Sequence, residues 1–295
     1  MASTFGLDDV DFWSDPLKEP VKVTMSSALA LDAPSVVPLH SRDTFPLVAR
    51  YRQSLKERFT LDFRANAVIA AIDLDRDEFF AGFALDRDGL EPIEPPDDDV
   101  EIPDATIVSP YVLELREQVD LPWRRADYVV YVVVRSTLSP KVRVSVGAAR
   151  GAYHDPAVDA FLEAAKVPPR ARRASPPEGD ELPSYQQRAA SPPLPSSPAI
   201  ALAVAATTDL VVHGSFRLPT ADPFAVIHLL LIGDRDATPI TLTLEVPTRR
   251  DGDDAIGWFA LALSPHVGVL PRPERYALYA FSRDVVGASG PIDLR

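Results

Sequence analysis

Three aspartates alternate in the segment IDLDRDEFFAG, and their spacing is that of a metal-binding loop. Asp73, Asp75 and Asp77 match the first three ligand positions of an EF-hand, whose oxygen ligands hold calcium. The sixth position of such a loop requires glycine but here holds Glu78, and the twelfth requires a bidentate glutamate but holds Ala84. The pattern therefore favours a solvated turn, with a calcium site at the three aspartates as the alternative.

A second acidic group lies in the segment EPIEPPDDDVEIPD, inside an insertion predicted over residues 86–108. The chain carries a net charge of −13, and residues 73–104 hold 13 acidic residues against two arginines, a local charge of −11. Such a balance repels nucleic acid and anionic membrane surfaces. Asp97, Asp98 and Asp99 serve either to solubilise a loop beside a sheet edge or to dock a basic partner protein.

Residues 1–20 have the composition of an acidic tail that carries apolar side chains without a regular period. Phe5, Leu7, Phe12 and Trp13 lie among its acidic residues. Aromatic side chains in a segment without a core of its own act as anchors in a partner protein, or they pack as an extra edge strand on the first domain. These four residues are therefore candidate partner-binding residues.

The motifs of common enzyme classes are missing from the sequence. There is no cysteine, which excludes disulfides, thiolate metal sites and cysteine nucleophiles. The five histidines have no zinc-binding spacing, and no nucleophile elbow, phosphate-binding loop or dinucleotide fingerprint occurs. We therefore predict no enzymatic activity. The carboxylate pair of a glycoside hydrolase has no fixed sequence spacing, so a hydrolase with a carboxylate site in the insertions stays as an alternative.

Proline usage and apolar periodicity predict a mainly β protein. The 30 prolines among 295 residues disfavour long helices. The apolar run at 65–75 predicts a strand buried on both faces, and the alternation at 141–146 predicts a strand with one solvated face. One short helix is predicted within residues 151–167, where Asp155 and Pro156 form a typical helix start.

Residues 168–198 hold nine prolines and few apolar side chains, which is typical of a disordered proline-rich linker. The block that follows, 199–295, shows seven short strand patterns, with the turn residues DGDD at 251–254. In the number and length of its strands this block resembles an immunoglobulin or fibronectin type III sandwich. The resemblance implies a fold and carries no function with it.

Parts of the chain before the linker resemble parts after it. The Tyr-x-x-Tyr and Asp-Arg-Asp sequences occur in both halves. Three blocks recur in the same order along the chain: 37–47 with 211–219, 67–77 with 225–236, and 111–135 with 259–283. Within the second block, Asp-Arg-Asp at 75–77 matches 234–236. We therefore predict an internal duplication that gives two tandem immunoglobulin/fibronectin-like antiparallel β-sandwich domains, at 21–150 and 199–295.

These features predict a non-enzymatic protein-binding or scaffolding protein that acts through the edges and loops of its sandwiches, with the linker letting two modules engage two surfaces. A calcium- or carbohydrate-binding module is the alternative. No apolar run reaches the about 20 residues of a membrane span, and the N-terminus lacks the basic flank and apolar core of a secretory signal. We therefore expect a soluble, cytoplasmic protein without a cofactor, although signal-independent export would leave the same sequence. No motif identifies the partner protein or sets the oligomeric state.

Overall fold

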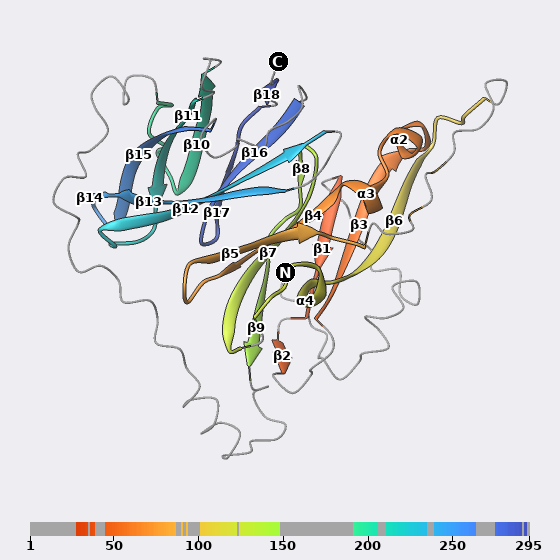
Figure 1. The fold of residues 1–295 in the computed structure, drawn as a ribbon, viewed down its shortest axis with the longest axis horizontal. Helices are drawn as coiled ribbons and strands as arrows, with labels where there is room; N and C mark the ends of the chain where they lie inside the picture. Colours follow the sequence, from red (N-terminus) through yellow and green to blue (C-terminus); the bar gives the residue numbers. More distant parts are fainter. Residues whose placement is uncertain are drawn as a thin grey trace. The chain divides into compact units, whose positions relative to one another are not determined.

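The computed structural model of the chain describes residues 28–34, 36–38, 45–86, 90, 93, 101–122, 124–147, 191–205, 211–234, 239–263, 275–290 and 292–293. The chain divides into two compact units, Met1–Pro168 and Pro169–Arg295. In each unit the described strands form two β-sheets (Figure 1). The predicted tail at 1–20 and helix at 151–167 lie outside the described residues, so both stay predictions, as do the domain boundaries drawn from them.

The first unit is a β-sandwich whose strands pair antiparallel except for β2 with β9. One sheet has the order β1-β3-β6, and the other has the order β2-β9-β7-β4-β5, with β8 also paired to β7. The first sheet contains β1 (Leu29–Asp32), β3 (Pro46–Ser54) and β6 (Thr106–Glu114). The second contains β2 (Val36–Pro38), β4 (Ala67–Asp73), β5 (Glu78–Phe83), β7 (Ala126–Val134), β8 (Thr137–Leu138) and β9 (Val142–Gly147).

Alternate residues along these strands fill the space between the two sheets. On β7, Tyr128, Val130 and Val132 belong to the buried core, as do Leu47 and Ala49 on β3 of the facing sheet. Side chains two residues apart on a strand lie on the same face, so each sheet contributes one apolar surface to the core. Burying these surfaces is the main driving force for folding of the unit.

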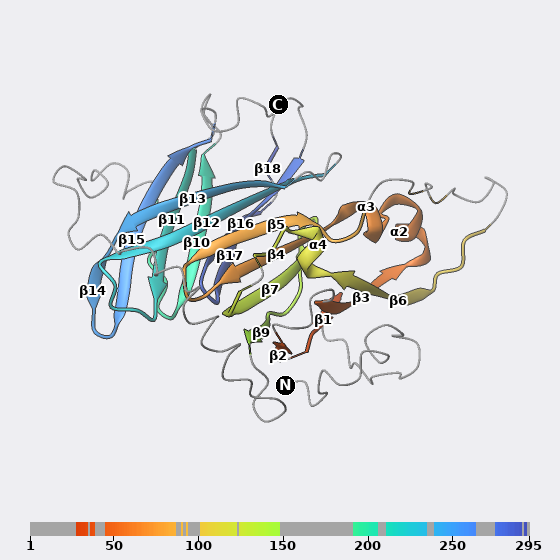
Figure 2. The ribbon, with the colours of Figure 1, turned by 60° about the horizontal axis from the view of Figure 1, so that its bottom comes forward.

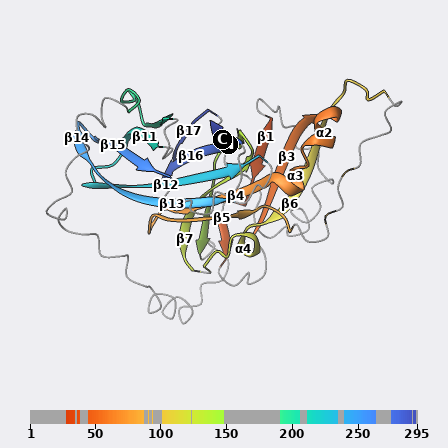
Figure 3. The same ribbon diagram turned by 45° about the horizontal axis from the view of Figure 1, so that its top comes forward.

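The described residues of the first unit include three short helices: α2 (Leu55–Thr60), α3 (Phe63–Asn66) and α4 (Leu115–Gln118). Of these, α2 and α3 follow β3 (Figure 3). Ser54 begins α2 with a capping box, because its hydroxyl accepts from the Glu57 N–H and the Glu57 carboxylate accepts from the Ser54 N–H. Phe63 stacks on Tyr111 with ring centroids 4.1 Å apart. Sequence analysis did not predict these helices, since four to six residues are too few for a helical apolar period.

The second unit is also a sandwich of two sheets, with all pairings antiparallel. The orders are β10-β11-β15-β14 and β13-β12-β16-β17, with β18 also paired to β16. The strands of the first sheet are β10 (Ala199–Ala205), β11 (Val211–Leu218), β14 (Arg249–Asp251) and β15 (Asp254–Ala262). Those of the second are β12 (Phe224–Gly233), β13 (Ile240–Pro247), β16 (Arg275–Ser282), β17 (Val285–Ala288) and β18 (Ile292–Asp293).

The two units share their strand order, which confirms the prediction of two tandem immunoglobulin/fibronectin-like sandwiches. The order β1-β3-β6 corresponds to β10-β11-β15, and β5-β4-β7 corresponds to β13-β12-β16. Tyr128 pairs with Val144 and Tyr276 pairs with Ile292. The two tyrosines thus hold equivalent places near the starts of β7 and β16, as the repeated Tyr-x-x-Tyr sequence predicts.

The hairpin turns that follow β7 and β16 also match. Arg135 and Arg283 are the first residues of the two turns, and their φ angles are 51° and 53°. A positive φ is uncommon for a residue other than glycine, so its presence at equivalent positions supports a duplicated unit.

One part of the predicted repeat is out of register. Leu74 N donates to Asp127 O, and Asp234 N donates to Arg275 O, each at 2.8 Å. Leu74 therefore holds the place of Asp234, and the match between the two Asp-Arg-Asp sequences is wrong by one residue. Every residue of β4 is buried, so this strand has no polar–apolar alternation that would fix an alignment.

The predicted match of 37–47 with 211–219 is also wrong. In the first unit the strand equivalent to β11 is β3, which begins only at Pro46. The segments were aligned on apolar residues and a shared histidine, and such residues recur in many strands without marking a position.

Burial, strand pairing and backbone angles confirm three of the predicted local features. The fully buried β4 matches the strand expected at 65–75 to have two buried faces. On β9, buried residues alternate with more exposed ones, as expected for 141–146. The turn predicted at 251–254 joins β14 to β15, and its Gly252 has a φ of 66°, a conformation that glycine adopts without steric cost.

The last eight residues of the predicted linker, 191–198, are described and contact β11, whereas 168–190 lie outside the described residues, so their disorder stays a prediction. Ser215 Oγ donates to Pro193 O at 3.0 Å, and Arg217 Nε donates to Pro195 O at 2.9 Å. Composition alone missed this segment because side-chain hydrogen bonds from β11, rather than apolar burial, hold it.

Two phenylalanines on neighbouring strands of the second unit pack over glycines. Phe216 on β11 pairs with Gly257 on β15, and Phe259 on β15 pairs with Gly214 on β11. A Cβ atom added at Gly257 would lie 2.3 Å from Cζ of Phe216. Both rings belong to the core of the unit, so the glycines leave the room that the rings occupy.

We predict that Gly257→Ala destabilises the second unit by about 1–3 kcal/mol, because the new methyl group forces the buried Phe216 ring out of its place. Chemical denaturation followed by circular dichroism measures the change. Gly290→Ala is the matched control, since nothing lies within 4 Å of a Cβ at that exposed position. Equal unfolding midpoints for the two variants would contradict the prediction.

Candidate functional site

The hairpin between β4 and β5 places a carboxylate inside the first unit. Asp73 ends β4 and is fully buried. Its Oδ1 accepts hydrogen bonds from the backbone N–H groups of Asp75 at 2.9 Å and Arg76 at 3.1 Å. A side chain that accepts from the backbone two residues later stabilises a turn, so Asp73 fixes the course of the chain between the two strands.

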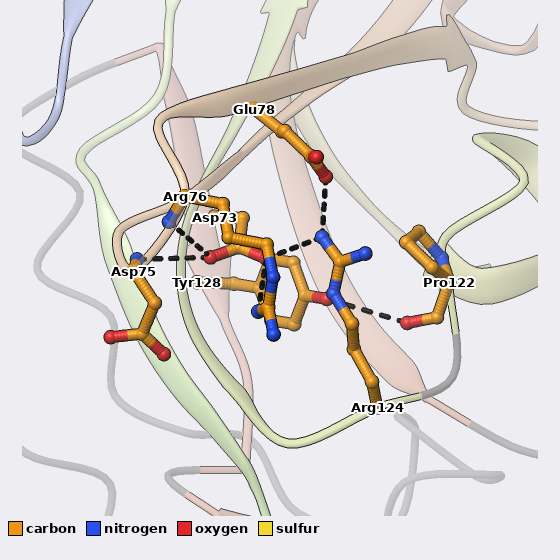
Figure 4. Close-up of polar contacts among 7 residues, drawn as sticks. All are labelled: Asp73, Asp75, Arg76, Glu78, Pro122, Arg124 and Tyr128. Carbon is orange, nitrogen blue, oxygen red and sulfur yellow. Dashed lines mark hydrogen bonds and ion pairs between the residues drawn. The ribbon is translucent and has the colours of Figure 1, made fainter. Parts of the chain in front are cut away.

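Two arginines approach the other oxygen of this carboxylate (Figure 4). Arg124 Nη2 lies 2.8 Å from Asp73 Oδ2 and also contacts Glu78 Oε2, while Arg76 Nη1 lies 3.4 Å from Asp73 Oδ2. Arg124 precedes β7, which pairs with β4 so that Tyr128 lies opposite Asp73. Strand pairing therefore brings together the charges of two segments about fifty residues apart.

Tyr128 closes the cluster on the side of β7. Its hydroxyl donates to Pro122 O at 3.4 Å, as in the tyrosine corner of immunoglobulin-like sandwiches. Burial raises the pKa of Tyr128, and the negative charge of Asp73 raises it further. Burial opposes the charge of Arg124, but hydrogen bonds to Asp73 and Glu78 outweigh that effect and raise its pKa. The tyrosine is thus a neutral hydrogen-bond donor, and the arginine is a fixed positive charge.

The alternative interpretation of Asp73, Asp75 and Asp77 as calcium ligands finds no support in their contacts. Asp73 already accepts four hydrogen bonds, whereas Asp75 is exposed and Asp77 lies in the turn with a φ of 53°. Among the described residues no group of three or more acidic or histidine side chains could hold a metal ion. These contacts favour a structural role for Asp73.

The charged cluster is a feature of the first unit alone within the described residues. The position equivalent to Asp73 is Gly233, which pairs with Tyr276 as Asp73 pairs with Tyr128. The sandwich fold therefore does not require the carboxylate. Sequence analysis singled out Asp73 but missed Arg124 and Glu78, because only the strand register brings these residues together.

A second candidate site is the outer edge of β6. Val108 is 49% exposed and Val112 is 36% exposed, and they are the only large hydrophobic side chains exposed among the described residues. β6 pairs with β3 on one side, and no other described strand pairs with it. An unpaired edge with exposed apolar side chains is a template for binding another strand.

The pairing of β6 with β3 decides which backbone groups face this open edge. Leu55 N donates to Ala105 O, and Leu115 N donates to Phe45 O, so the odd-numbered residues of β6 bond to β3. In an antiparallel pair the intervening residues direct their backbone groups away from the partner strand. The backbone groups of Val108 and Val112 therefore face the edge, and between them lies Pro110, which has no N–H to donate.

In the second unit only the start of the equivalent edge is covered. β14 pairs with residues 254–256 of β15 and lies beside that end of the strand (Figure 2). No described strand pairs with the rest of that edge. The first unit has the acidic insertion at the corresponding place in the chain. Its Glu101 and Asp104 are exposed just before β6 begins.

Several predicted binding residues lie outside the described part of the chain. They are Phe5, Leu7, Phe12, Trp13, Asp97, Asp98 and Asp99, and their roles stay predictions. Sequence analysis assigned Val108 to the insertion and not to a strand. The alternation in TIVSPYVLE carried a strand signal there, but Pro110 interrupts it.

No family model and no curated protein matches the chain. Among solved structures, the chain is similar to the chicken CNTN1 FN1-FN3 domains, with 10% identity and a TM-score of 0.20, over 89% of this chain and 65% of that one. It is also similar to a structure that describes neurohormone perception by the receptor tyrosine kinase Torso. The identity is 7% and the TM-score is 0.17, over 88% of this chain and 70% of that one.

The chain thus spans just under two thirds of the CNTN1 structure. Both TM-scores are low, whereas the strand order of the two units shows the sandwich fold directly. Within the described residues, no helix has the length and apolar character needed to cross a membrane.

We predict that Asp73→Asn destabilises the first unit by about 2–3 kcal/mol, because two arginines lose their buried negative partner. Asp75→Asn, at an exposed neighbouring position, is the matched control and is expected to change stability by less than about 0.5 kcal/mol. Chemical denaturation of both variants measures the difference. A loss as small for Asp73→Asn as for the control would show that the cluster contributes little.

We expect that calcium at millimolar concentration leaves the melting temperature unchanged, because arginine and backbone donors occupy the Asp73 carboxylate. Differential scanning calorimetry with calcium, and with magnesium as the control ion, measures this. A saturable rise in melting temperature that is specific to calcium and lost in Asp73→Asn would restore the metal-site hypothesis.

Proposed function

We propose that this chain is a non-enzymatic protein-binding protein, and that the open edge of β6 adds an extended segment of a partner as a further strand. The observation that carries the proposal is the coincidence of exposed Val108 and Val112 with backbone groups that face away from β3. Strand addition obtains affinity from main-chain hydrogen bonds and specificity from alternate side chains.

The edge sets the chemistry of the segment that it would bind. Pro110 removes one donor at its centre, so a bound strand pairs over Thr106–Val108 or over Val112–Glu114 rather than continuously. The exposed Glu101 and Asp104 precede the first of these halves. A short segment with alternating apolar side chains and basic neighbours therefore complements this edge.

An enzymatic role has less support from the described residues. A hydrolase with a carboxylate site requires two carboxyl groups that reach a substrate. Asp73 and Glu78 are joined through one arginine, and Asp73 is fully buried. Both carboxylates are paired with Arg124, so neither is placed to act on a substrate. This pairing favours a binding function over catalysis.

The tandem layout extends the proposal from one surface to a scaffold. Each sandwich has a core of its own, and the proline-rich tract separates them in sequence. Two modules on one chain raise the avidity for a bivalent target through effective concentration. A cytoplasmic setting with a protein partner and without a cofactor is part of this proposal.

The proposal is tested with a random dodecapeptide library selected on the full chain. We expect the selected peptides to carry alternating apolar residues and to lose at least about tenfold in affinity for Val108→Lys, since a charge then replaces the apolar contact. Thr241→Lys, at an exposed strand position of the second unit, is the matched control and should bind as the native chain does. Peptides that bind Val108→Lys and the native chain equally would exclude this edge as the binding site.

A further inference from the structure

The second unit already holds a peptide-like segment on the outer face of β11. Residues 191–198, here called the strap, read SPPLPSSP. Pro193 O accepts from Ser215 Oγ at 3.0 Å, and Pro195 O accepts from Arg217 Nε at 2.9 Å. Both bonds join residues 22 positions apart, so the strap runs parallel to β11 over this stretch.

The strap is separate from the strand that follows it. Ala199, the first residue of β10, pairs antiparallel with Arg217, which also bonds Pro195. The chain therefore reverses direction between Pro195 and Ala199, within three residues. The strap lies over side chains of β11, whereas β10 bonds to its backbone. It behaves as a ligand on a sheet face and not as a strand of the sheet.

Side chains along one face of β11 donate hydrogen bonds to the carbonyl groups of the strap. Ser215 and Arg217 lie on the face of β11 opposite the core residues Val212 and Phe216. Residues two apart on a strand are spaced by about 6.6 Å, and two residues of an extended proline-rich chain span about 6.2 Å. The two periods match closely enough for successive donors to meet alternate carbonyl groups.

His213 is the next residue on this face, and it carries an unused polar atom. It is 9% exposed, and its Nδ1 has no hydrogen-bond partner among the described residues. A buried polar atom without a partner costs stability unless a ligand satisfies it. Ser215, Arg217 and His213 thus form a row of three polar side chains along one strand, only two of which the strap satisfies through the contacts described.

Arg217 is held in position before any ligand is considered. Its Nη2 pairs with Asp251 at 2.6 Å and its Nη1 pairs with Asp254 at 3.1 Å, which leaves Nε directed at Pro195. Hydrogen bonds to both carboxylates raise the pKa of Arg217, so the charge is constant at ordinary pH. A donor fixed in this way loses little freedom when it binds a carbonyl group.

We propose that this face of β11 is a recognition site for extended proline-rich segments, that the strap fills it within the chain, and that a proline-rich segment of a partner protein takes its place in trans. The row of donors recognises backbone carbonyl groups, which suits a segment whose prolines offer acceptors and no N–H groups. This site lies in the second unit and is independent of the edge of β6.

The experiment uses the full chain with the strap replaced by eight glycine and serine residues, and a fluorescent peptide with the sequence of residues 189–198 as the probe. We expect saturable binding by fluorescence polarisation. The native chain should bind the peptide at least about tenfold more weakly, because the tethered strap competes at millimolar effective concentration. A peptide with its prolines replaced by glycine should bind more weakly, since it is less preorganised.

Two substitutions in the strap-replaced chain identify the site. Arg217→Met should abolish binding of the peptide, while Arg249→Met, an exposed arginine on β14, should leave it unchanged. Absence of saturable binding to the strap-replaced chain, or binding that survives Arg217→Met, would overturn the proposal.

A second measurement covers the case in which the strap-replaced chain does not fold. The same peptide is then titrated at millimolar concentration into the native chain, and the methyl resonances of Leu194 are followed by NMR. Movement of these resonances towards their values in a free peptide supports exchange of the strap, and resonances that stay in place overturn it.

Discussion

The pairing of two central strands in the larger sheet of each sandwich is the constraint on which the rest of the structure depends. In the first unit β4 pairs with β7, and in the second β12 pairs with β16. This register decides which side chains enter the core, because a shift of one residue would turn every side chain to the other face. It also places Asp73 opposite Tyr128 and within reach of Arg124. The hairpin turns after β7 and β16 then continue the same register into the next strand.

Each unit stabilises an irregular segment with an arginine that contacts two carboxylates, but the arginine lies at a different place in each unit. In the first unit Arg124 joins the buried Asp73 to Glu78 and so holds the turn after β4 against the segment before β7. In the second unit Arg217 joins Asp251 and Asp254 to the carbonyl group of Pro195. Each arginine uses several donors of its planar guanidinium group at once. A duplicated fold has thus acquired two different fixed charges outside the shared core.

The fold could be predicted from the sequence further than the sites could. The apolar residues of β4 and the alternating residues of β9 predict their burial. The recurrence of the Tyr-x-x-Tyr sequence predicts which strands of the two units are equivalent. The predicted alignment of the repeat is wrong by one residue at the Asp-Arg-Asp sequence, because the buried strand before it has no polar–apolar alternation that would fix the register. The sites depend on contacts that sequence spacing does not encode. Arg124 meets Asp73 only through strand pairing, and the strap meets β11 only because the chain reverses before Ala199.

Pro110 has a consequence for how many molecules the edge of β6 can join. A strand that adds to a sheet normally exposes a new edge of its own, so addition can repeat without end and produce a filament. An interrupted edge pairs with only a few residues of an added strand. A strand that is paired over so short a stretch is a poor template for a further strand. Strand addition at this edge, as proposed above, would therefore stop after a single step and give complexes of defined size.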